Sequence, residues 1–327
     1  MNKPYIQAAP FTLQLGLVRG CNLMCSFCGI NGIRAKAGNY EFAELSTVTN
    51  FAKQVAKAKW TSMILLALHG EPSLHPKLAE CISILRQHLP KNDITLVSNG
   101  SGFRRPGKEV ESVKAVFKAG LTKLALDDYE SSGYIPKLMT ALGNDIPFKV
   151  LHYPKDGLDT SPWRRWPAKR QAIVVLADLQ KNAKEHIGLA QLSNHCGAAG
   201  PLTEKLAGQR CAKVFREFSV RESGDISCCC QDWRGQSKVG NINTTPIDVL
   251  WQNEVMQALR RKLYHGERDQ GPCLGCDYRS TRVGLLPDKF GKDTLPHADK
   301  HDIAVLTAAS AGPSLTQIVL RPWEVIK

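Results

Sequence analysis

Short apolar runs alternate with amphipathic helical segments over about the first 180 residues. The apolar runs, each typical of a strand, lie at 12–18, 62–66, 94–98, 123–127, 148–153 and 172–176. Helical patterns lie between most of them, near residues 43–58, 75–89, 109–119 and 134–142. Alternation of this kind is typical of βα units built around a parallel sheet. The sequence therefore predicts an α/β fold in which six such units form an open, partial barrel.

Polar or glycine-containing turns follow several of the predicted strands. These turns are Arg19-Gly20, His69-Gly70, Asn99-Gly100 and Asp127-Asp128. The carboxyl ends of parallel strands meet at one edge of a sheet, where α/β folds place their chemistry. We expect the active site at this edge.

The 327-residue chain has 11 cysteines and a formal net charge of +13. Its first residues include Pro4 and Pro10 and are not typical of a signal peptide. No run of about 18 apolar residues offers a membrane span. We expect a cytoplasmic protein without membrane attachment, in which thiols stay reduced. Clustered cysteines in that compartment bind metal or take part in redox chemistry.

Cys21, Cys25 and Cys28 directly follow the first predicted strand, with the spacing C-x3-C-x2-C. Three thiolates on one short loop can each bind one iron of a [4Fe–4S] cubane. The fourth iron then stays open for a substrate or cofactor. The alternatives are a zinc site completed by a distant residue and chance clustering.

This loop resembles the cluster-binding loop of the radical S-adenosylmethionine (SAM) superfamily, and three further segments match in the family's order. They are His69-Gly70-Glu71-Pro72, Ser98-Asn99-Gly100 and Leu124-Ala125-Leu126-Asp127. By this resemblance, the turn at Gly70, Glu71 and Pro72 receives the ammonium group of SAM on backbone oxygens. Ser98 and Asn99 contact its ribose and carboxylate. For each segment, the alternative is an ordinary turn or helix cap.

The resemblance implies a reaction as well as a cofactor. A reduced cluster passes an electron to the sulfonium of SAM, the S–C5′ bond breaks, and a 5′-deoxyadenosyl radical takes a hydrogen atom from the substrate. The electron comes from a donor such as flavodoxin or ferredoxin. Candidate catalytic residues are Asp127, Asp128, Tyr153, His195 and Cys196. A purely structural role is the alternative for His195.

A second set of cysteines follows the predicted barrel. Cys211, Gly224 and Cys229 have the spacing C-x12-G-x4-C, and Cys273 and Cys276 form a C-x2-C element. These spacings resemble the SPASM and twitch extensions of the superfamily, which bind auxiliary iron–sulfur clusters. By this resemblance, the four cysteines hold a second [4Fe–4S] cluster. A zinc ribbon is the alternative, because four-cysteine zinc sites use similar spacings.

Two details refine the prediction for this second set. Cys228 and Cys230 flank Cys229 and, in an extended segment, point to the opposite face from it. The full SPASM pattern has another cysteine about six residues after Cys276, but Arg282 stands there and no cysteine follows. We therefore expect one auxiliary cluster and a twitch-like domain.

The composition changes at two points along the chain. The strand and helix alternation stops near residue 180, and glycine, cysteine and polar residues dominate until about residue 285. We predict a partial (β/α)6 TIM-like barrel over residues 1–180. A small cysteine-rich twitch or SPASM-like domain follows over 181–285, and a C-terminal extension over 286–327.

An aromatic and basic cluster, Trp163-Arg164-Arg165-Trp166, bears on the substrate. Arginines bind phosphates, tryptophans stack on bases, and the net charge favours polyanions. We predict an anionic substrate, a nucleotide or a nucleic-acid base, for example an amino-acid-modified thymidine rearranged in phage DNA. The alternative for the cluster itself is a solvated loop with buried indole rings.

Three other functions are open. Two are enzymatic, namely modification of a ribosomal peptide or protein, and dehydrogenation or epimerisation of a small metabolite. The third is a non-enzymatic iron–sulfur or zinc protein that binds nucleic acid. Such a protein has no need of a cluster with an open iron.

Overall fold

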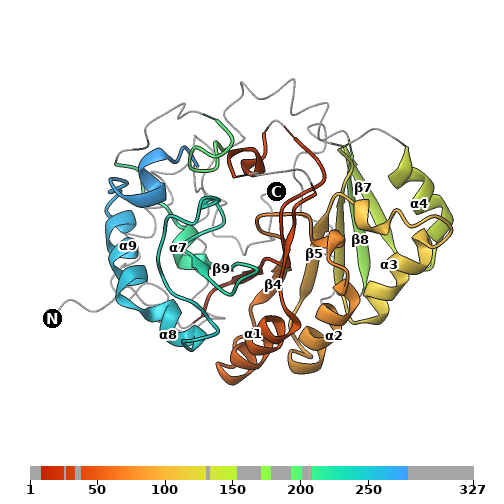
Figure 1. The fold of residues 1–327 in the computed structure, drawn as a ribbon, viewed down its shortest axis with the longest axis horizontal. Helices are drawn as coiled ribbons and strands as arrows, with labels where there is room; N and C mark the ends of the chain where they lie inside the picture. The colour runs from red at the N-terminus through yellow and green to blue at the C-terminus, as the bar shows by residue number, and fades with distance from the viewer. Residues whose placement is uncertain are drawn as a thin grey trace, which may run out of the picture.

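One eight-stranded sheet forms the centre of the molecule (Figure 1). The computed structural model describes residues 9–25, 27–33, 38–129, 133–152, 171–177, 193–200, 206 and 208–278. In spatial order the strands are β10 (Ile226–Ser227), β9 (Glu217–Val220), β1 (Thr12–Leu15), β4 (Met63–Leu66), β5 (Ile94–Ser98), β6 (Lys123–Asp127), β8 (Ala172–Ala177) and β7 (Phe148–His152). Neighbouring strands are parallel throughout, except for the antiparallel pair of β9 and β10. The predicted α/β fold with a parallel sheet is confirmed.

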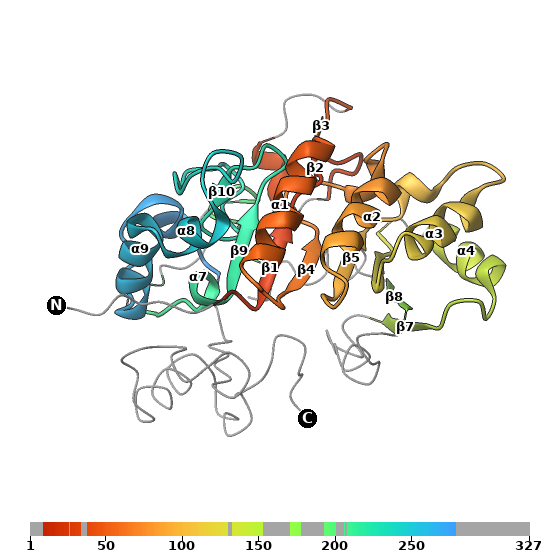
Figure 2. The same ribbon diagram turned by 90° about the horizontal axis from the view of Figure 1, so that it is seen from below.

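Four amphipathic helices follow the strands and lie along one side of the sheet (Figures 1 and 2). They are α1 (Leu45–Lys57), α2 (Leu78–His88), α3 (Glu109–Lys118) and α4 (Tyr134–Leu142). In α1, Val48, Phe51, Ala52 and Val55 are fully buried, with the i, i+3, i+4, i+7 spacing of one apolar face. These helices match the four predicted segments.

At one edge of the sheet, β8 lies between β6 and β7, so the spatial order of these strands differs from their order in the chain. The apolar residues of β8 from Ala172 to Val175 are buried, which suits a central position. In β7, Phe148 and Val150 remain 41% and 38% exposed. Partial exposure of these two side chains is consistent with the edge position of β7, which pairs with β8.

The C-terminal part of the chain extends the same sheet at its other end (Figure 1). Besides β9 and β10 it supplies α7 (Lys213–Arg216), α8 (Ile247–Gln252), α9 (Glu254–Tyr264) and the 3-10 turn η4 (Gly271–Gly275). Gln54 of α1 donates to the Ile242 carbonyl at 2.8 Å and accepts from the Ile247 amide at 2.6 Å. Both halves therefore share one hydrophobic core.

The division at residues 180 and 181 stays a prediction, although β9 shows that the two predicted units share a sheet. The predicted extension over 286–327 lies outside the described residues. Within the described part of the chain, every helix is too short or too polar to cross a bilayer.

Candidate active site

The loop that carries Cys21, Cys25 and Cys28 leaves the sheet after β1 and is fixed by short backbone pairings. β2 (Val18–Arg19) pairs with β3 (Glu41–Phe42), and Gly20 forms a parallel bridge with Gly70. A Cβ atom on Gly70 would lie 2.2 Å from the Val18 carbonyl oxygen, so only glycine permits this crossing. The first two predicted motifs are thereby brought together.

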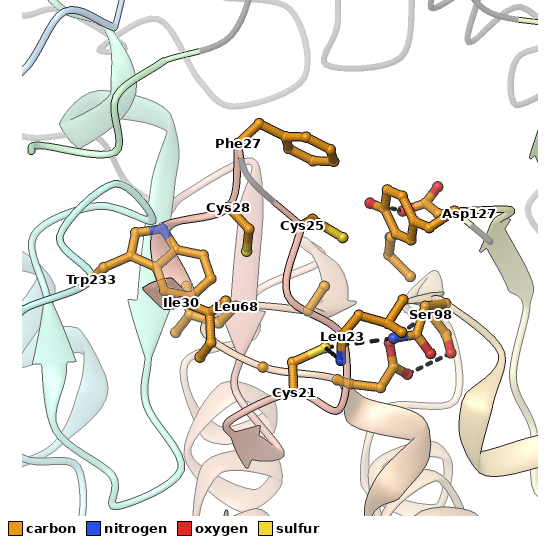
Figure 3. Close-up of a pocket in the computed structure, with 16 residues that line it drawn as sticks. Cys21, Leu23, Cys25, Phe27, Cys28, Ile30, Leu68, Ser98, Asp127 and Trp233 are labelled. Atoms are coloured by element: carbon orange, nitrogen blue, oxygen red, sulfur yellow. Dashed lines mark hydrogen bonds between the residues drawn. The ribbon is translucent and has the colours of Figure 1, made fainter. Parts of the chain in front are cut away.

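A pocket beside this loop is lined by all three cysteines (Figure 3). Trp233 and Asp127 lie on opposite sides of the cysteines in this view. The remaining described lining residues come mainly from the ends of β4, β5 and β6 and from the cysteine loop; they are Leu23, Phe27, Ile30, Ala67, Leu68, Gly70, Glu71, Val97, Ser98, Asn99 and Tyr129.

The chemistry of the donors fits an iron–sulfur cluster. Burial raises the pKa of the Cys21 thiol to about 12, while the Leu23 amide donates to its sulfur at 3.3 Å. The Asn99 Nδ2 group donates to the same sulfur at 3.5 Å. These donors stabilise the thiolate form that binds iron. Within the described lining there is no fourth cysteine and no histidine, so the three thiols suit a cubane with one open iron.

Glu71 holds the turns of β4 and β5 together. Its buried carboxylate accepts hydrogen bonds from the Ser73 amide at 2.9 Å, the Ser98 hydroxyl at 2.6 Å and the Asn99 amide at 2.8 Å. Burial raises the pKa of Glu71, and these hydrogen bonds oppose the increase. Pro72 follows as the first residue of a 3-10 turn. The predicted SAM-binding residues thus form one network beside Cys21, and their contact with SAM stays a prediction.

A half-buried carboxyl and phenol pair, Asp127 and Tyr129, lines the pocket at the end of β6. The Tyr129 hydroxyl donates to Asp127 Oδ2 at 3.0 Å, and the Tyr129 ring packs against Phe27 with centroids 5.8 Å apart. Burial raises the pKa of Asp127 to about 7, although the hydrogen bond from Tyr129 lowers it. Asp127 can therefore exchange a proton near neutral pH. The described pocket lining includes Asp127 but not the other predicted residue, Asp128.

The four cysteines of the second set also lie close to one another. The thiols of Cys211, Cys229, Cys273 and Cys276 lie within electrostatic range of one another. No three His, Cys, Asp or Glu side chains of the described residues converge on a single metal ion. Zinc needs its sulfurs at about 2.3 Å, whereas a cubane takes one thiolate at each of four corners. Four thiols suit the four corners of a cubane, a zinc ribbon stays the alternative, and the ligand roles stay predictions.

The flanking cysteines behave differently from each other. The Cys230 sulfur lies 3.6 Å from Glu217 Oε2. The Cys228 thiol instead contacts that of Cys229. The expectation that both flanking thiols face away from Cys229 is therefore wrong for Cys228, because the backbone turns after β10 instead of staying extended.

Two predicted catalytic residues lie outside the described pocket lining. His195 Nδ1 accepts a hydrogen bond from the Trp233 indole at 3.2 Å, and burial lowers the pKa of His195. The Cys196 thiol lies within electrostatic range of Cys276. Tyr153 and the cluster Trp163, Arg164, Arg165 and Trp166 lie outside the described residues.

Sequence reasoning missed Trp233 as a pocket residue. A Cβ atom on Gly29 would lie 2.6 Å from the indole ring, so the cysteine loop packs directly on it. The side chain is positioned by a tight loop in which Asp232 accepts from the Gln236 and Ser237 amides at 2.8 and 2.9 Å. Nothing in the local pattern signals a contact with a loop 200 positions earlier in the chain.

Two family models match the chain. Residues 16–127 match the model described as the radical SAM superfamily, and residues 211–277 match SPASM, an iron–sulfur cluster-binding domain. The chain contains a radical SAM domain followed by a SPASM domain. It is therefore an enzyme that uses SAM and a [4Fe–4S] cluster, and its SPASM domain binds further iron–sulfur. No protein of curated function matches the sequence.

Solved structures of radical SAM proteins share the fold. The crystal structure of BtrN in complex with AdoMet and 2-DOIA has a TM-score of 0.61 and 16% identity, covering 86% of this chain and 96% of that one. An open conformation of BtrN has a TM-score of 0.55 and 14% identity, and the match covers 85% of this chain and 95% of that one. Streptococcus suis SuiB bound to precursor peptide SuiA has a lower TM-score of 0.41 and 13% identity, and the match covers 77% of this chain and 67% of that one. The two BtrN structures show that this radical SAM enzyme has the BtrN fold.

Proposed function

We propose that this radical SAM enzyme binds SAM in the pocket beside Cys21, Cys25 and Cys28 and uses it to abstract hydrogen from a substrate. The supporting observation is that the three thiols, the Glu71 network and Asp127 line one pocket. When bound, the cluster supplies the electron that breaks the S–C5′ bond of SAM, and the resulting 5′-deoxyadenosyl radical takes the substrate hydrogen.

The chain's own residues prepare this pocket. Glu71 fixes the turns that contain Ser98 and Asn99, so that polar groups face SAM without rearrangement. Phe27, Leu68 and Trp233 contribute apolar surface that excludes water from a reactive radical. The carboxyls of Glu71 and Asp127 suit the cationic sulfonium and ammonium groups of SAM.

Asp127 predicts a pH dependence of SAM binding. Because its pKa is about 7, the carboxyl is mostly neutral at pH 6 and mostly anionic at pH 8. We expect SAM to bind about fivefold more tightly at pH 8, since an added anion contributes on the order of 1 kcal/mol toward a nearby cation. Asp127→Asn removes this increase. Calorimetric titration of both proteins from pH 6 to pH 8 tests it, and an identical pH profile in the variant contradicts it.

We further propose an anionic substrate, a nucleotide or a base in nucleic acid, such as an amino-acid-modified thymidine. Three exposed cations support this, because they lie within a few residues of the pocket lining in the sequence. Arg105 and Lys108 follow the turn that contains Asn99, and Arg234 follows Trp233. With a net charge of +13, these residues favour a polyanion at the pocket rim.

The rim cations give a testable salt dependence. The double variant Arg105→Ala/Lys108→Ala is expected to weaken DNA binding and to reduce the slope of log Kobs against log salt by about 1 to 2. Fluorescence anisotropy at several salt concentrations measures both. The matched control is Lys53→Ala/Lys57→Ala, which removes the same charge from exposed positions on α1. Equal losses in both double variants speak against a rim site.

A small polar molecule is the second candidate substrate. No Lys, Arg or His side chain is among the described lining residues, so this part of the pocket has no cation for a phosphate. BtrN, whose fold this chain shares, was crystallised with AdoMet and 2-DOIA. A nucleic-acid substrate accelerates 5′-deoxyadenosine release from SAM, whereas DNA leaves the rate unchanged if the substrate is a small molecule.

The electron source and the compartment complete the proposal. Reduction of the cluster requires a one-electron donor, for which we propose flavodoxin or ferredoxin. The eleven cysteines are thiols in the structure, which suits a reducing compartment, and we propose the cytoplasm.

A further inference from the structure

Arg268, in the loop between α9 and η4, joins two segments of the SPASM domain that are far apart in sequence. Its Nε donates to the Gln209 carbonyl at 2.9 Å, and its Nη2 donates to the Arg210 carbonyl at 3.1 Å. The remaining nitrogen, Nη1, donates to the Tyr278 carbonyl at 3.1 Å. The residue is only 7% exposed. One buried guanidinium therefore connects the chain at 209–210 to the chain at 278.

Both connected segments contain proposed ligands of the auxiliary cluster. Arg210 directly precedes Cys211 in the sequence. At the other segment, the Tyr278 amide donates to the Cys276 sulfur at 3.4 Å, while the carbonyl of the same residue accepts from Arg268. The hydrogen bonds of Arg268 therefore fix the backbone beside two corners of the proposed cluster.

The charge of Arg268 has no carboxylate partner among its hydrogen bonds in the described part of the chain, because all three acceptors are backbone carbonyls. Buried charges in proteins are normally paired with an opposite charge. Burial raises the pKa of the Cys211 thiol to about 11, and the nearby charge of Arg268 opposes this increase. Burial likewise raises the pKa of Cys273, again opposed by Arg268. The charge thus acts on the cysteine set, and a cubane bound by thiolates is the anion that would balance it.

We propose that Arg268 is a positioning residue of the auxiliary site and that its positive charge raises the reduction potential of the auxiliary cluster. Reduction adds an electron to an anionic group, so a nearby cation stabilises the reduced form more than the oxidised form. Asp277, next to Cys276 in the sequence, has the opposite charge and is expected to lower the potential. This inference rests on the proposed auxiliary site and adds a residue that makes its cluster easier to reduce.

Redox titration followed by electron paramagnetic resonance tests the proposal. The protein is a Cys21→Ala/Cys25→Ala/Cys28→Ala background, which leaves only the auxiliary site. In this background Arg268→Met removes the charge and keeps much of the side-chain length. At a fixed potential it is expected to lower the ratio of reduced to oxidised cluster about tenfold, equivalent to about 59 mV for a one-electron couple. Arg268→Lys keeps the charge and is expected to retain most of the potential.

Two further variants separate charge from packing. Asp277→Asn removes a negative charge but keeps an oxygen that can accept from the Asn194 amide, so the potential is expected to rise. Arg86→Met is the matched control, because Arg86 on α2 also donates to backbone carbonyls, including those of Gly120 and Leu89. Its partners are remote in sequence from the second cysteine set, and the potential is expected to stay unchanged.

The outcomes distinguish this inference from the proposal beneath it. If the background protein holds no cluster, the auxiliary site is wrong and the role of Arg268 falls with it. If the cluster is present but Arg268→Met leaves the potential unchanged, or Arg268→Lys lowers it equally, only the role of the charge is wrong. If Arg268→Met assembles no cluster, iron content decides. Arg268→Lys is then expected to keep about four irons per chain, and an equally empty Arg268→Lys protein overturns the role of the charge.

Discussion

Cys25→Ala is expected to abolish the release of 5′-deoxyadenosine from SAM and to lower the iron content from about eight to about four per chain. Cys25 lines the pocket with Cys21 and Cys28 and is itself buried. Because each thiolate binds one iron, loss of this ligand leaves two on the loop, too few for a stable cluster. The auxiliary irons remain, since their proposed ligands are elsewhere in the chain. Iron analysis and product chromatography after anaerobic reconstitution measure the two effects.

Cys81→Ala is the matched control for removing a buried thiol. Cys81 is fully buried in α2, where its sulfur lies 3.8 Å from His75 Nδ1 and does not line the pocket. This variant is expected to keep both clusters and the cleavage activity. A Cys25→Ala protein that retains all its irons and still cleaves SAM contradicts the ligand assignment.

Glu71→Ala is expected to lower the melting temperature by about 6 °C or more. The substitution leaves the Ser73 amide, Ser98 hydroxyl and Asn99 amide without their acceptor. Each unsatisfied buried donor costs about 1 kcal/mol or more, and 1 kcal/mol corresponds to about 2 °C or more in a chain of this size. SAM binding falls with stability, because Asn99 also contacts Cys21. Thermal unfolding and calorimetric titration measure the two effects.

Two further variants test the network. Glu71→Gln keeps an acceptor for some donors but opposes its own NH2 group to one of the others, so an intermediate loss is expected. Glu44→Ala is the control, because Glu44 is exposed and its side chain makes no capping hydrogen bond at the start of α1. Equal melting temperatures for Glu71→Ala and Glu44→Ala contradict a bridging role for Glu71.

The strands and helices were predictable because their signals are local. The apolar runs at Ile94–Ser98 and Lys123–Asp127 match β5 and β6 to the residue, and the pattern at Tyr134–Leu142 matches α4. The strand order was not predictable. Parallel pairing joins residues that are far apart in sequence, as β1 does with β9, and no local pattern encodes that choice.

Part of the candidate site was likewise predictable from the sequence, and part was not. The spacing of Cys21, Cys25 and Cys28 on one loop was sufficient to predict three thiols at one site. Trp233 and Cys196 were different, because each acquires its position through contacts across the fold. Cys196 lies within electrostatic range of Cys276, 80 positions later in the chain, and this proximity arises only in three dimensions.

The most direct test of the central claim is reductive cleavage of SAM by the unmodified protein. Protein reconstituted anaerobically to about eight irons per chain, then reduced with dithionite, is expected to release 5′-deoxyadenosine from SAM, as measured by chromatography. Omission of the reductant serves as the control and gives none. Fully loaded, reduced protein that binds SAM but releases no 5′-deoxyadenosine, with or without candidate substrates, contradicts the proposed active site.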